Sequence, residues 1–397
     1  MDDLAEANKS NQDTINMGGG SPFPIKASRE VYTSLFQELA NSRAEIEKLY
    51  GQYSAPAGNQ ETRDKLAGYL RKKFGWNVSS EHVAVTNGNQ AALFVLFNML
   101  GGPNESAERN EILFPLIPEY VGYQNLLLPG LKVRAPKPSI QILNDHLFEY
   151  RVDFSRIQVT EKTAAVCLSQ PSNPAGKIHS ETDLKKLDYI SNEKGAPLII
   201  DSAYGAPFPN IIFSECPPYW SENTILLLSL SKLGLPGLRS GLIVASPERI
   251  AAFSKFSTSL NLAPNSIGAH ILTELVSRGA IDHLCSQTIC NFYQEKIAFA
   301  SSKLISSLAD TPCRLHHMGG GFFIWLWCEH LPFLGRELYS RLKTKGVVVA
   351  PGEEFFLGLE PDWSHGRECI RISCALPDTQ LNVGIELIAD EIVDAYR

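Results

Sequence analysis

The sequence predicts an α/β protein with a large domain, built on a mostly parallel sheet covered by helices, and a smaller α+β domain. Its 397 residues exceed the roughly 250–300 at which one hydrophobic core stops growing, so more than one domain is expected. From residue 61 onward, helical periodicity alternates with short apolar runs, a rhythm typical of parallel strands joined by crossover helices. Beyond about residue 310, strands and helices follow a different, mixed order, which indicates the second domain.

The N-terminal third alternates helices with two short strands. The chain is polar up to about residue 15, and Gly18-Gly19-Gly20-Ser21-Pro22 forms a turn-rich entry to a helix predicted over residues 27–49. Apolar residues then recur at helical spacing over 60–74, 89–99 and 119–128. Short apolar runs between these helices predict strands over 83–86 and 112–115.

The middle of the chain continues the alternation. A strand over 164–168 is followed by a helix that the capping box Ser180-x-x-Asp183 opens. Further strands are predicted over 197–201, 224–229 and 241–245. The runs 198–200 and 225–228 are apolar on both faces, as expected for central strands covered by helices on both sides.

The last part of the chain predicts the smaller domain. After a helical stretch over 265–310, strands are predicted over 322–327, 347–349 and 370–372, with helices over 335–345 and 378–396. We therefore expect an N-terminal segment, 1–48, that joins the small domain, a large domain over 49–285, and a small C-terminal α+β domain over 286–397.

Composition and charge argue against several classes of protein. Apolar residues make up 44% of the chain and charged residues 20%, which is ordinary for a globular protein. The net charge of -7 provides no overall positive charge to attract nucleic acid or an anionic membrane, so small-molecule partners are favoured. An acidic start and the lack of an apolar run of about 18–20 residues predict a cytoplasmic protein.

The eight cysteines form no C-x-x-C pair, which favours reduced thiols over disulfides or a zinc site. Adjacent His316 and His317 predict no metal site either, because neighbours on a strand face opposite sides.

The segment from Ser229 to Arg239 follows a fully apolar strand and contains the first candidate site residue. Ligands of doubly wound sheets lie beyond the carboxyl ends of the strands, so polar residues there are the first candidates. Lys232 stands near two serines and two glycines, and an amine held in a crevice becomes a Schiff-base nucleophile once burial lowers its pKa. Arg239, seven residues later, can hold a phosphate. The alternative is a solvated surface lysine.

Two more predicted strands end in residues that could bind the same ligand as Lys232 and Arg239. A carboxylate at Asp201 can keep a pyridinium nitrogen protonated, and Tyr204 can donate to a ring oxygen. Alternatively, Asp201 caps a helix and Tyr204 belongs to the core.

The turn Asn87-Gly88-Asn89-Gln90 can hold a phosphate through the free N–H groups of the helix that follows. It lacks the motifs G-x-G-x-x-G and G-K-[ST], which argues against dinucleotide and nucleotide sites, and an ordinary turn remains the alternative.

Three further residues suit a planar, anionic ligand. Asn173, between two prolines, can direct its amide at a ring oxygen, and Tyr120 offers an aromatic face for stacking. Either segment could also be a plain loop. Arg371 stands among apolar neighbours on a strand, where a guanidinium needs a carboxylate partner for bidentate hydrogen bonds. That partner is either a substrate or, alternatively, a side chain in a structural salt bridge.

Taken together, these segments resemble the class I/II family of pyridoxal-phosphate-dependent aminotransferases, which has the fold called type I. The resemblance covers nearly the whole chain, and the motifs follow the family's order. They are Gly20-x-Pro22, Tyr53 ahead of Gly58, Gly88-x-Gln90, Tyr120, Asn173-Pro174-x-Gly176, Asp201-x-x-Tyr204, Ser229-x-x-Lys232 with Arg239, and Arg371. The family implies a mixed, mostly parallel seven-stranded sheet in the large domain.

The resemblance also implies a role for each residue. Lys232 would hold pyridoxal 5′-phosphate as a Schiff base and carry the substrate proton, Asp201 would pair with the ring nitrogen, and Tyr204 would bond the ring oxygen. The other implied cofactor contacts are Gly88, Asn89, Gln90, Ser229 and Arg239 at the phosphate, Tyr120 and Asn173 at the ring, and Tyr53 at the phosphate of the neighbouring subunit in a homodimer. The implied substrate contacts are Gly20, Asn173 and Arg371. The interval from Lys232 to Arg239 is seven residues, one shorter than is often found in the family, so the loop must be tighter.

The implied reaction is transfer of an amino group between L-valine and pyruvate by a ping-pong mechanism. This substrate choice rests on local similarity to family members with that activity, in the stretches 114–116 with 118–120, 203–205 with 207–209, 211–215, and 229–237. The alternative is another enzyme on the same cofactor and fold, either an aminotransferase of different specificity or a lyase. A transcription regulator built on this fold would need a basic DNA-binding domain, which the residues before Gly18 are too few to supply.

Overall fold

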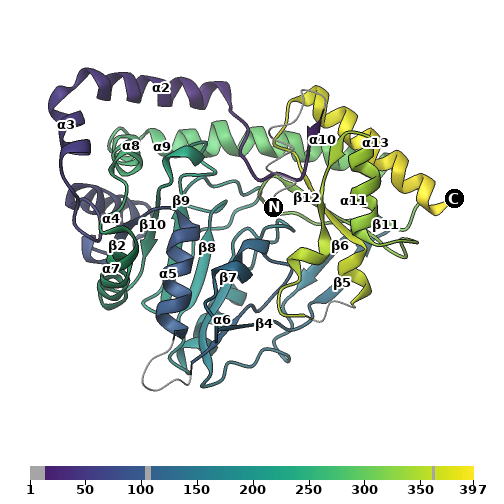
Figure 1. The fold of residues 1–397 in the computed structure, drawn as a ribbon, viewed down its shortest axis with the longest axis horizontal. Coiled ribbons are helices and arrows are strands. Elements are labelled where there is room, and N and C mark those ends of the chain that lie inside the picture. The colour runs from purple at the N-terminus through teal and green to yellow at the C-terminus, as the bar shows by residue number, and fades with distance from the viewer. Residues whose placement is uncertain (1–13, 103–108, 360–362) are drawn as a thin grey trace.

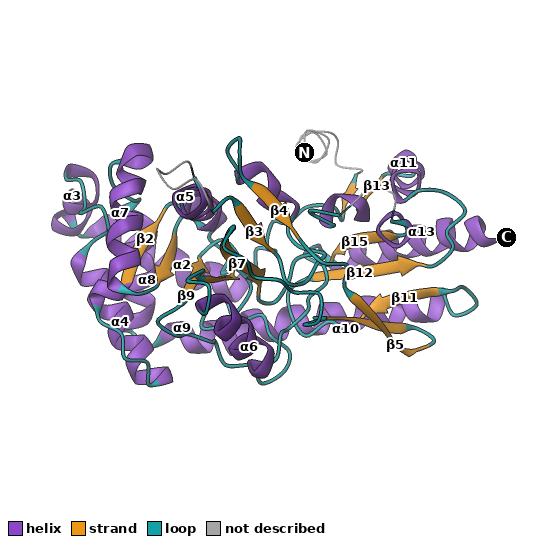
Figure 2. Ribbon diagram, turned by 90° about the horizontal axis from the view of Figure 1, so that it is seen from below, coloured by secondary structure: helices purple, strands orange, loops and turns teal. Residues whose placement is uncertain are grey.

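The computed structural model describes residues 14–102, 109–359 and 363–397. Most of the polar N-terminal stretch noted in the sequence falls outside these ranges. Within the described residues, no helix is both long and apolar enough to cross a lipid bilayer. Figure 1 shows one sheet at the centre of the molecule and a second beside it, and Figure 2 shows many of the loops gathered between the two.

The central sheet has seven strands in the order β2-β10-β9-β8-β7-β3-β4. Their bounds are β2 (Val83–Thr86), β10 (Gly241–Val244), β9 (Thr224–Ser229), β8 (Leu198–Ser202), β7 (Thr163–Ser169), β3 (Glu111–Leu113) and β4 (Lys132–Arg134). Strand β10 runs antiparallel to both its neighbours, and every other pair is parallel. The expected mixed, mostly parallel seven-stranded sheet is therefore confirmed.

Helices cover both faces of this sheet because its strands are apolar on both faces. Leu198 and Ile200 on β8 belong to one hydrophobic cluster, whereas Ile199 between them belongs to another. This alternation follows from the two-residue period of a strand. The flanking helices are α4 (Gln60–Phe74), α5 (Asn89–Gly101), α6 (Glu181–Asn192), α7 (Pro247–Asn261) and α8 (Ser266–Ser277).

The second sheet has six strands in the order β14-β15-β12-β11-β6-β5. Their bounds are β14 (Ala350–Pro351), β15 (Cys369–Ser373), β12 (Phe323–Cys328), β11 (Cys313–His316), β6 (Leu147–Arg151) and β5 (Ser139–Asn144). Helices α10 (Asn291–Ser307), α11 (Gly335–Thr344) and α13 (Asp378–Tyr396) pack around it, and α13 ends at the C-terminus (Figure 1). Near the N-terminus, β1 (Ile15–Asn16) pairs in parallel with β13 (Val347–Val348).

Strands β5 and β6 were not predicted from the sequence. They form a hairpin within residues 139–151, in the range expected to belong to the large domain, and join β11 of the six-stranded sheet. The segment Ser139-Ile140-Gln141-Ile142 does alternate polar and apolar residues, but it is short, and most residues of β5 are exposed. Strand β5 pairs with the adjacent β6, and the hairpin joins the sheet through the pairing of β6 with β11, more than 150 residues away.

Three predicted helical stretches differ from the structure. The helix expected over 27–49 is two helices, α2 (Lys26–Asn41) and α3 (Arg43–Gly51), because Ser42 between them has extended backbone torsions. The helix expected over 119–128 is a short 3₁₀ segment, η2 (Val121–Leu126). A Cβ at Gly122 would lie only 2.3 Å from the Tyr120 ring, so this turn folds back tightly onto that ring. The stretch 265–310 is several helices, which include α9 (Ala280–His283) and a π-helical turn over 284–290.

Candidate active site

Polar side chains from the ends of several strands converge near Lys232. Its Nζ donates a 2.6 Å hydrogen bond to the carbonyl of Gly20, and lies 5.5 Å from the centre of the Tyr204 ring. Across the same region, Arg371 donates to Asn173, and the carboxylate of Asp201 lies close enough to influence the charge on Lys232. Residues predicted separately along the sequence are thus brought together between the two sheets.

The amine of Lys232 is held in a state that favours nucleophilic attack. Burial lowers the pKa of Lys232 to about 8, repulsion from Arg371 and Arg239 adds to the shift, and attraction to Asp201 opposes it. At pH 7 about a tenth of this side chain is therefore the free amine that attacks an aldehyde, against fewer than about one in a thousand for an ordinary lysine. The alternative of a solvated surface lysine does not fit this position.

Asp201 is a buried carboxylate at the end of β8 and has three hydrogen-bond donors. Asn89 Nδ2 and the backbone N–H of Ala203 donate to Oδ1 at 2.7 and 3.2 Å, and the hydroxyl of Tyr123 donates to Oδ2 at 2.9 Å. Burial raises the pKa of Asp201 above its usual range, although these bonds and Lys232 oppose the shift. A buried carboxylate of this kind gains most from a cationic partner, and a protonated pyridine nitrogen fits that requirement.

The turn between β2 and α5 forms a cradle that fits a phosphate. Gly88 precedes the first turn of α5 with φ of +91°, and the free N–H groups of that turn favour an anion. A Cβ on Gly88 would approach Nη2 of Arg239 to 2.9 Å, so the guanidinium lies directly against this turn. Residues 236–238 form a 3₁₀ turn, and Arg239 after it has left-handed backbone torsions. This tight local backbone is how the seven-residue interval from Lys232 places the guanidinium at the turn before α5.

Not every residue predicted at the phosphate points its side chain there. The side chain of Asn89 bonds Asp201, so only its backbone N–H is left for an anion. Gln90 is exposed. The hydroxyl of Ser229 accepts a hydrogen bond from the N–H of Ser231, which leaves its own proton available to a phosphate. The cradle thus offers backbone N–H groups, the hydroxyl of Ser229 and the guanidinium of Arg239.

Arg371 lies in the middle of β15 and is buried without a carboxylate partner among the described residues. Its Nη1 donates to Asn173 Oδ1 at 2.8 Å and its Nη2 to the carbonyl of Gly18 at 2.7 Å, whereas Nε has no hydrogen-bond partner in the described chain. The rings of Phe323 and Phe355 flank the guanidinium at 4.1 and 4.9 Å. Burial lowers the pKa of Arg371 to about 10, so it remains a cation at neutral pH. An uncompensated buried cation fits a carboxylate ligand, and the alternative of a structural salt bridge is not found.

The three tyrosines predicted for the site lie in different surroundings. Tyr204 is buried and packs edge-on against Phe322 and Phe323, and Tyr120 is partly buried beside Tyr123. Tyr53 is 82% exposed in the segment after α3 and takes no part in the cluster around Lys232. In a single chain, therefore, Tyr53 is available to a second molecule but not to its own site.

Three residues near the site were not identified from the sequence as part of it: Glu119, Tyr123 and Ser169. Tyr123 donates to Asp201, and the buried carboxyl of Glu119 accepts from the N–H of Ser169 at 2.8 Å. The spacing of Tyr120 and Tyr123, one turn apart on a 3₁₀ segment, was the available signal for Tyr123. A buried glutamate has no comparable local signature.

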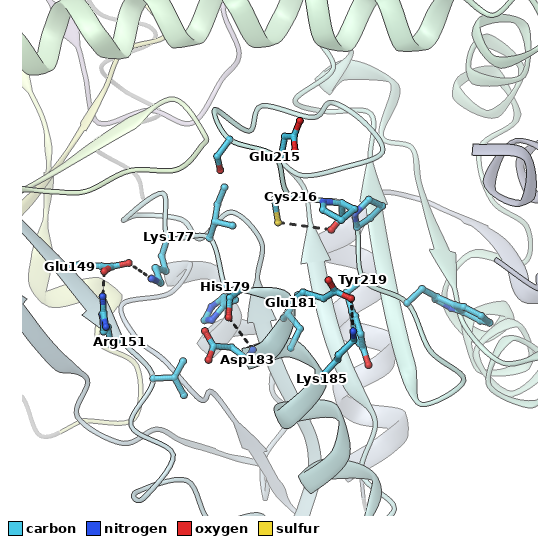
Figure 3. Close-up of a pocket in the computed structure, with 18 of the residues that line it drawn as sticks. Glu149, Arg151, Lys177, His179, Glu181, Asp183, Lys185, Glu215, Cys216 and Tyr219 are labelled. Atoms are coloured by element: carbon cyan, nitrogen blue, oxygen red, sulfur yellow. Dashed lines mark hydrogen bonds and ion pairs between the residues drawn. The ribbon is translucent and has the colours of Figure 1, made fainter. Parts of the chain in front are cut away.

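A cavity of about 910 Å³ lies elsewhere, beside α6 (Figure 3). Lys177, His179, Asp183 and Cys216 are among its lining residues, and none of the predicted site residues lines it. Lys232 borders a much smaller cavity of about 50 Å³ together with Phe23 and Tyr293. The candidate site is therefore defined by converging side chains and not by cavity size. Among the described residues, no group of three or more His, Cys, Asp or Glu side chains could hold a metal ion.

Comparisons with known proteins agree with this geometry. Residues 25–388 match the family described as aminotransferase class I and II. The chain is 37% identical to valine–pyruvate aminotransferase from Escherichia coli K12 over 382 residues, which cover 96% of this chain and 91% of that protein. A crystal structure of a putative amino-acid aminotransferase from Psychrobacter arcticum superposes with a TM-score of 0.96 at 38% identity and covers all of this chain and 95% of that chain. The crystal structure of valine–pyruvate aminotransferase from Salmonella typhimurium LT2 gives 0.91 at 35% identity, with 100% and 99% covered. The chain therefore belongs to the class I and II aminotransferase family, whose members have the type I fold and depend on pyridoxal 5′-phosphate.

Proposed function

We propose that this aminotransferase moves an amino group between L-valine and pyruvate, giving 3-methyl-2-oxobutanoate and L-alanine. The observation that carries the chemistry is a buried lysine with a lowered pKa, Lys232, near a buried carboxylate, Asp201, and a buried guanidinium, Arg371. The choice of substrates is supported by two relatives named for this reaction, at 37% and 35% identity over nearly the whole chain.

Pyridoxal phosphate supplies an aldehyde that accepts an amine, and a ring that withdraws electrons from the amino-acid Cα. In our proposal Lys232 holds the aldehyde, Asp201 faces the ring nitrogen, and Tyr204 and Asn173 lie toward the ring oxygen. Tyr120 would stack on the ring. The phosphate would bind at Gly88, the first turn of α5 and Arg239, where backbone N–H groups and a guanidinium are available.

Lys232 and Asp201 have complementary tasks in this scheme. The free amine of Lys232 would take the proton from the substrate Cα and return it to the former aldehyde carbon of the cofactor, a transfer that needs a base with a pKa near neutrality. Asp201 keeps the ring nitrogen protonated, because a buried carboxylate stabilises a cation within hydrogen-bond reach. The donors Asn89 and Tyr123 hold Asp201 in one orientation.

Arg371 would fix the substrate through its α-carboxylate. The flanking rings of Phe323 and Phe355 shield the guanidinium from water, which strengthens its attraction for an anion. The carbonyls of Gly18 and Gly20 bond Arg371 and Lys232, so the N-terminal segment closes over the same site. A carboxylate that binds here displaces none of these bonds if it reaches the unpartnered Nε of Arg371.

We further propose that the active form is a cytoplasmic homodimer. Tyr50 and Tyr53 are 74% and 82% exposed, and Leu262 is 59% exposed, an apolar set that a second subunit would cover. In that dimer Tyr53 would reach the phosphate in the neighbouring site. All eight cysteines are free thiols, which supports a reducing compartment.

A half-reaction tests the proposed function. Adding L-valine to the protein loaded with pyridoxal phosphate should convert the cofactor's absorbance from its aldehyde form to its amine form, and adding pyruvate should restore it. L-Aspartate serves as the control donor and should react far more slowly, because its second carboxylate lacks a partner. An unchanged spectrum with L-valine would refute the substrate, and an unchanged spectrum with every amino acid tried would favour a lyase on the same fold.

A further inference from the structure

Glu119 is a buried carboxyl group that binds a serine and no basic side chain of the described chain. It lies just before Tyr120 and is 1% exposed. The N–H of Ser169 donates to Oε1 at 2.8 Å, and the hydroxyl of Ser169 forms a second, short bond to Oε2. Both oxygens of Glu119 are therefore engaged by one residue at the end of β7.

Ser169 connects this carboxyl group to the substrate-binding region. Its hydroxyl oxygen accepts a 3.3 Å hydrogen bond from the N–H of Asn173, so its own proton is free to point at Glu119. Asn173 in turn accepts from Nη1 of Arg371 at 2.8 Å. Hydrogen bonds thus run from Glu119 through Ser169 to the backbone N–H of Asn173, and the side-chain oxygen of Asn173 bonds the guanidinium.

The backbone of Glu119 reaches the same guanidinium from another direction. Its N–H donates at 2.9 Å to the carbonyl of Phe355, and the Phe355 ring lies 4.9 Å from Arg371. Phe355 belongs to the segment after β14, in the six-stranded sheet, whereas Ser169 belongs to the seven-stranded sheet. Glu119 therefore bonds to a segment next to each sheet, and Arg371 contacts residues of both segments, Asn173 and Phe355.

We propose that Glu119 is a positioning residue for the substrate carboxylate, acting on Arg371 through Ser169 and Asn173. This inference rests on the proposed role of Arg371. Glu119 touches neither substrate nor cofactor in this scheme. Through Ser169, its side chain fixes the backbone of Asn173, which sets the position of the side-chain oxygen that bonds the guanidinium. Loss of the side chain lets Asn173 and Arg371 adopt several orientations, so carboxylate affinity falls while the lysine chemistry stays intact.

The electrostatics of Glu119 explain which substitution should preserve its action. Burial raises the pKa of Glu119 to about 8, against the lowering effect of both bonds from Ser169, and the nearby Asp201 raises it further. The group is therefore largely neutral at pH 7. A glutamine has the same shape, and its carbonyl oxygen accepts from the N–H of Ser169. Its amide N–H donates to the Ser169 hydroxyl, which reverses the direction of the second bond but keeps the contact, so Glu119→Gln should act like the native residue.

The probe for this proposal is 3-methylbutanoate, which has the carbon skeleton and carboxylate of valine but no amine to transfer. Its dissociation constant for the pyridoxal-phosphate-loaded protein is measured by calorimetry at pH 7. We expect Glu119→Ala to weaken binding about tenfold, the scale of one lost buried hydrogen bond, and Glu119→Gln to change it by less than about twofold. Ser169→Ala, which removes the middle of the series, should weaken binding in the same direction and decides the question if Glu119→Ala fails to fold.

Glu391→Ala is the matched control, since Glu391 is a buried glutamate that pairs with Lys345 and Arg341 on a different part of the small domain. It should lower the unfolding temperature without changing the affinity for 3-methylbutanoate. Native affinity in folded Glu119→Ala, or a loss in Glu119→Gln as large as in Glu119→Ala, overturns the positioning role. If the native protein does not bind the probe, or if Arg371→Ala binds it equally well, the proposed function fails instead.

Discussion

Gly88 shows how one residue determines whether the cradle between β2 and α5 can form. Its φ of +91° and ψ of 159° lie in a region that residues with a side chain rarely adopt, at a cost of about 1–3 kcal/mol. A Cβ there would also meet Nη2 of Arg239 at 2.9 Å. Both effects act on the groups that we assign to the phosphate.

We therefore expect Gly88→Ala to weaken pyridoxal phosphate binding by about tenfold or more, since it displaces one charged hydrogen-bonding group. Titration of the cofactor by absorbance measures this effect. Gly279→Ala is the control, because Gly279 also has a positive φ, +65°, but a Cβ there meets nothing within 4 Å. The control should lower stability by about 1–2 kcal/mol and leave cofactor affinity unchanged. Equal cofactor affinity in Gly88→Ala and the native protein would contradict the cradle.

The sequence was informative about residues whose position alone reveals their role. Asp201 follows the apolar run of β8, Lys232 comes shortly after the apolar run of β9, and Arg371 interrupts the apolar strand β15, so the sequence made each of them stand out. Glu119 and Tyr123 did not stand out, because their partners are 50 and 78 residues away and only the folded sheet brings them close.

Elements were predictable where their own residues determine them. Strands β8 and β9 are buried along their whole length, and their apolar runs identified them directly. The hairpin of β5 and β6 was missed because β5 is mostly exposed. In addition, the strand that the hairpin joins in the sheet, β11, lies far away in the sequence. The break between α2 and α3 was also missed, since the apolar spacing continues through Ser42 while the backbone turns there. Tertiary contacts, and not local propensity, decide such cases.

The whole molecule brings two sheets together at the site. Asn173 follows a strand of the seven-stranded sheet and Arg371 lies in the six-stranded sheet, yet their side chains bond at 2.8 Å across 198 residues of chain. The N-terminal segment closes the same region through Gly18 and Gly20. The site therefore needs both sheets and the N-terminal segment to be folded together. In our proposal it also needs a second subunit.

The proposed dimer predicts that two defective chains restore each other. A Lys232→Ala chain lacks the amine in its own site, and a Tyr53→Ala chain lacks the hydroxyl that would serve the neighbouring site. A mixed dimer of the two retains one intact site, so at limiting cofactor it should have about half the activity of the native dimer, as two-fold symmetry requires. Differently tagged, co-expressed chains isolate the mixed dimer for this assay. Activity no higher than that of either parent, or a monomer in sedimentation, would contradict the shared site.

The most direct test of the account concerns the lysine itself. Borohydride reduction of the pyridoxal-phosphate-loaded protein fixes the cofactor to whichever amine holds it, and peptide mass spectrometry identifies that residue. The account predicts stoichiometric labelling of the peptide that contains Lys232, and no stoichiometric labelling at any site in Lys232→Ala. Stoichiometric labelling of a different lysine, or equal labelling of Lys232→Ala and the native protein, would contradict it.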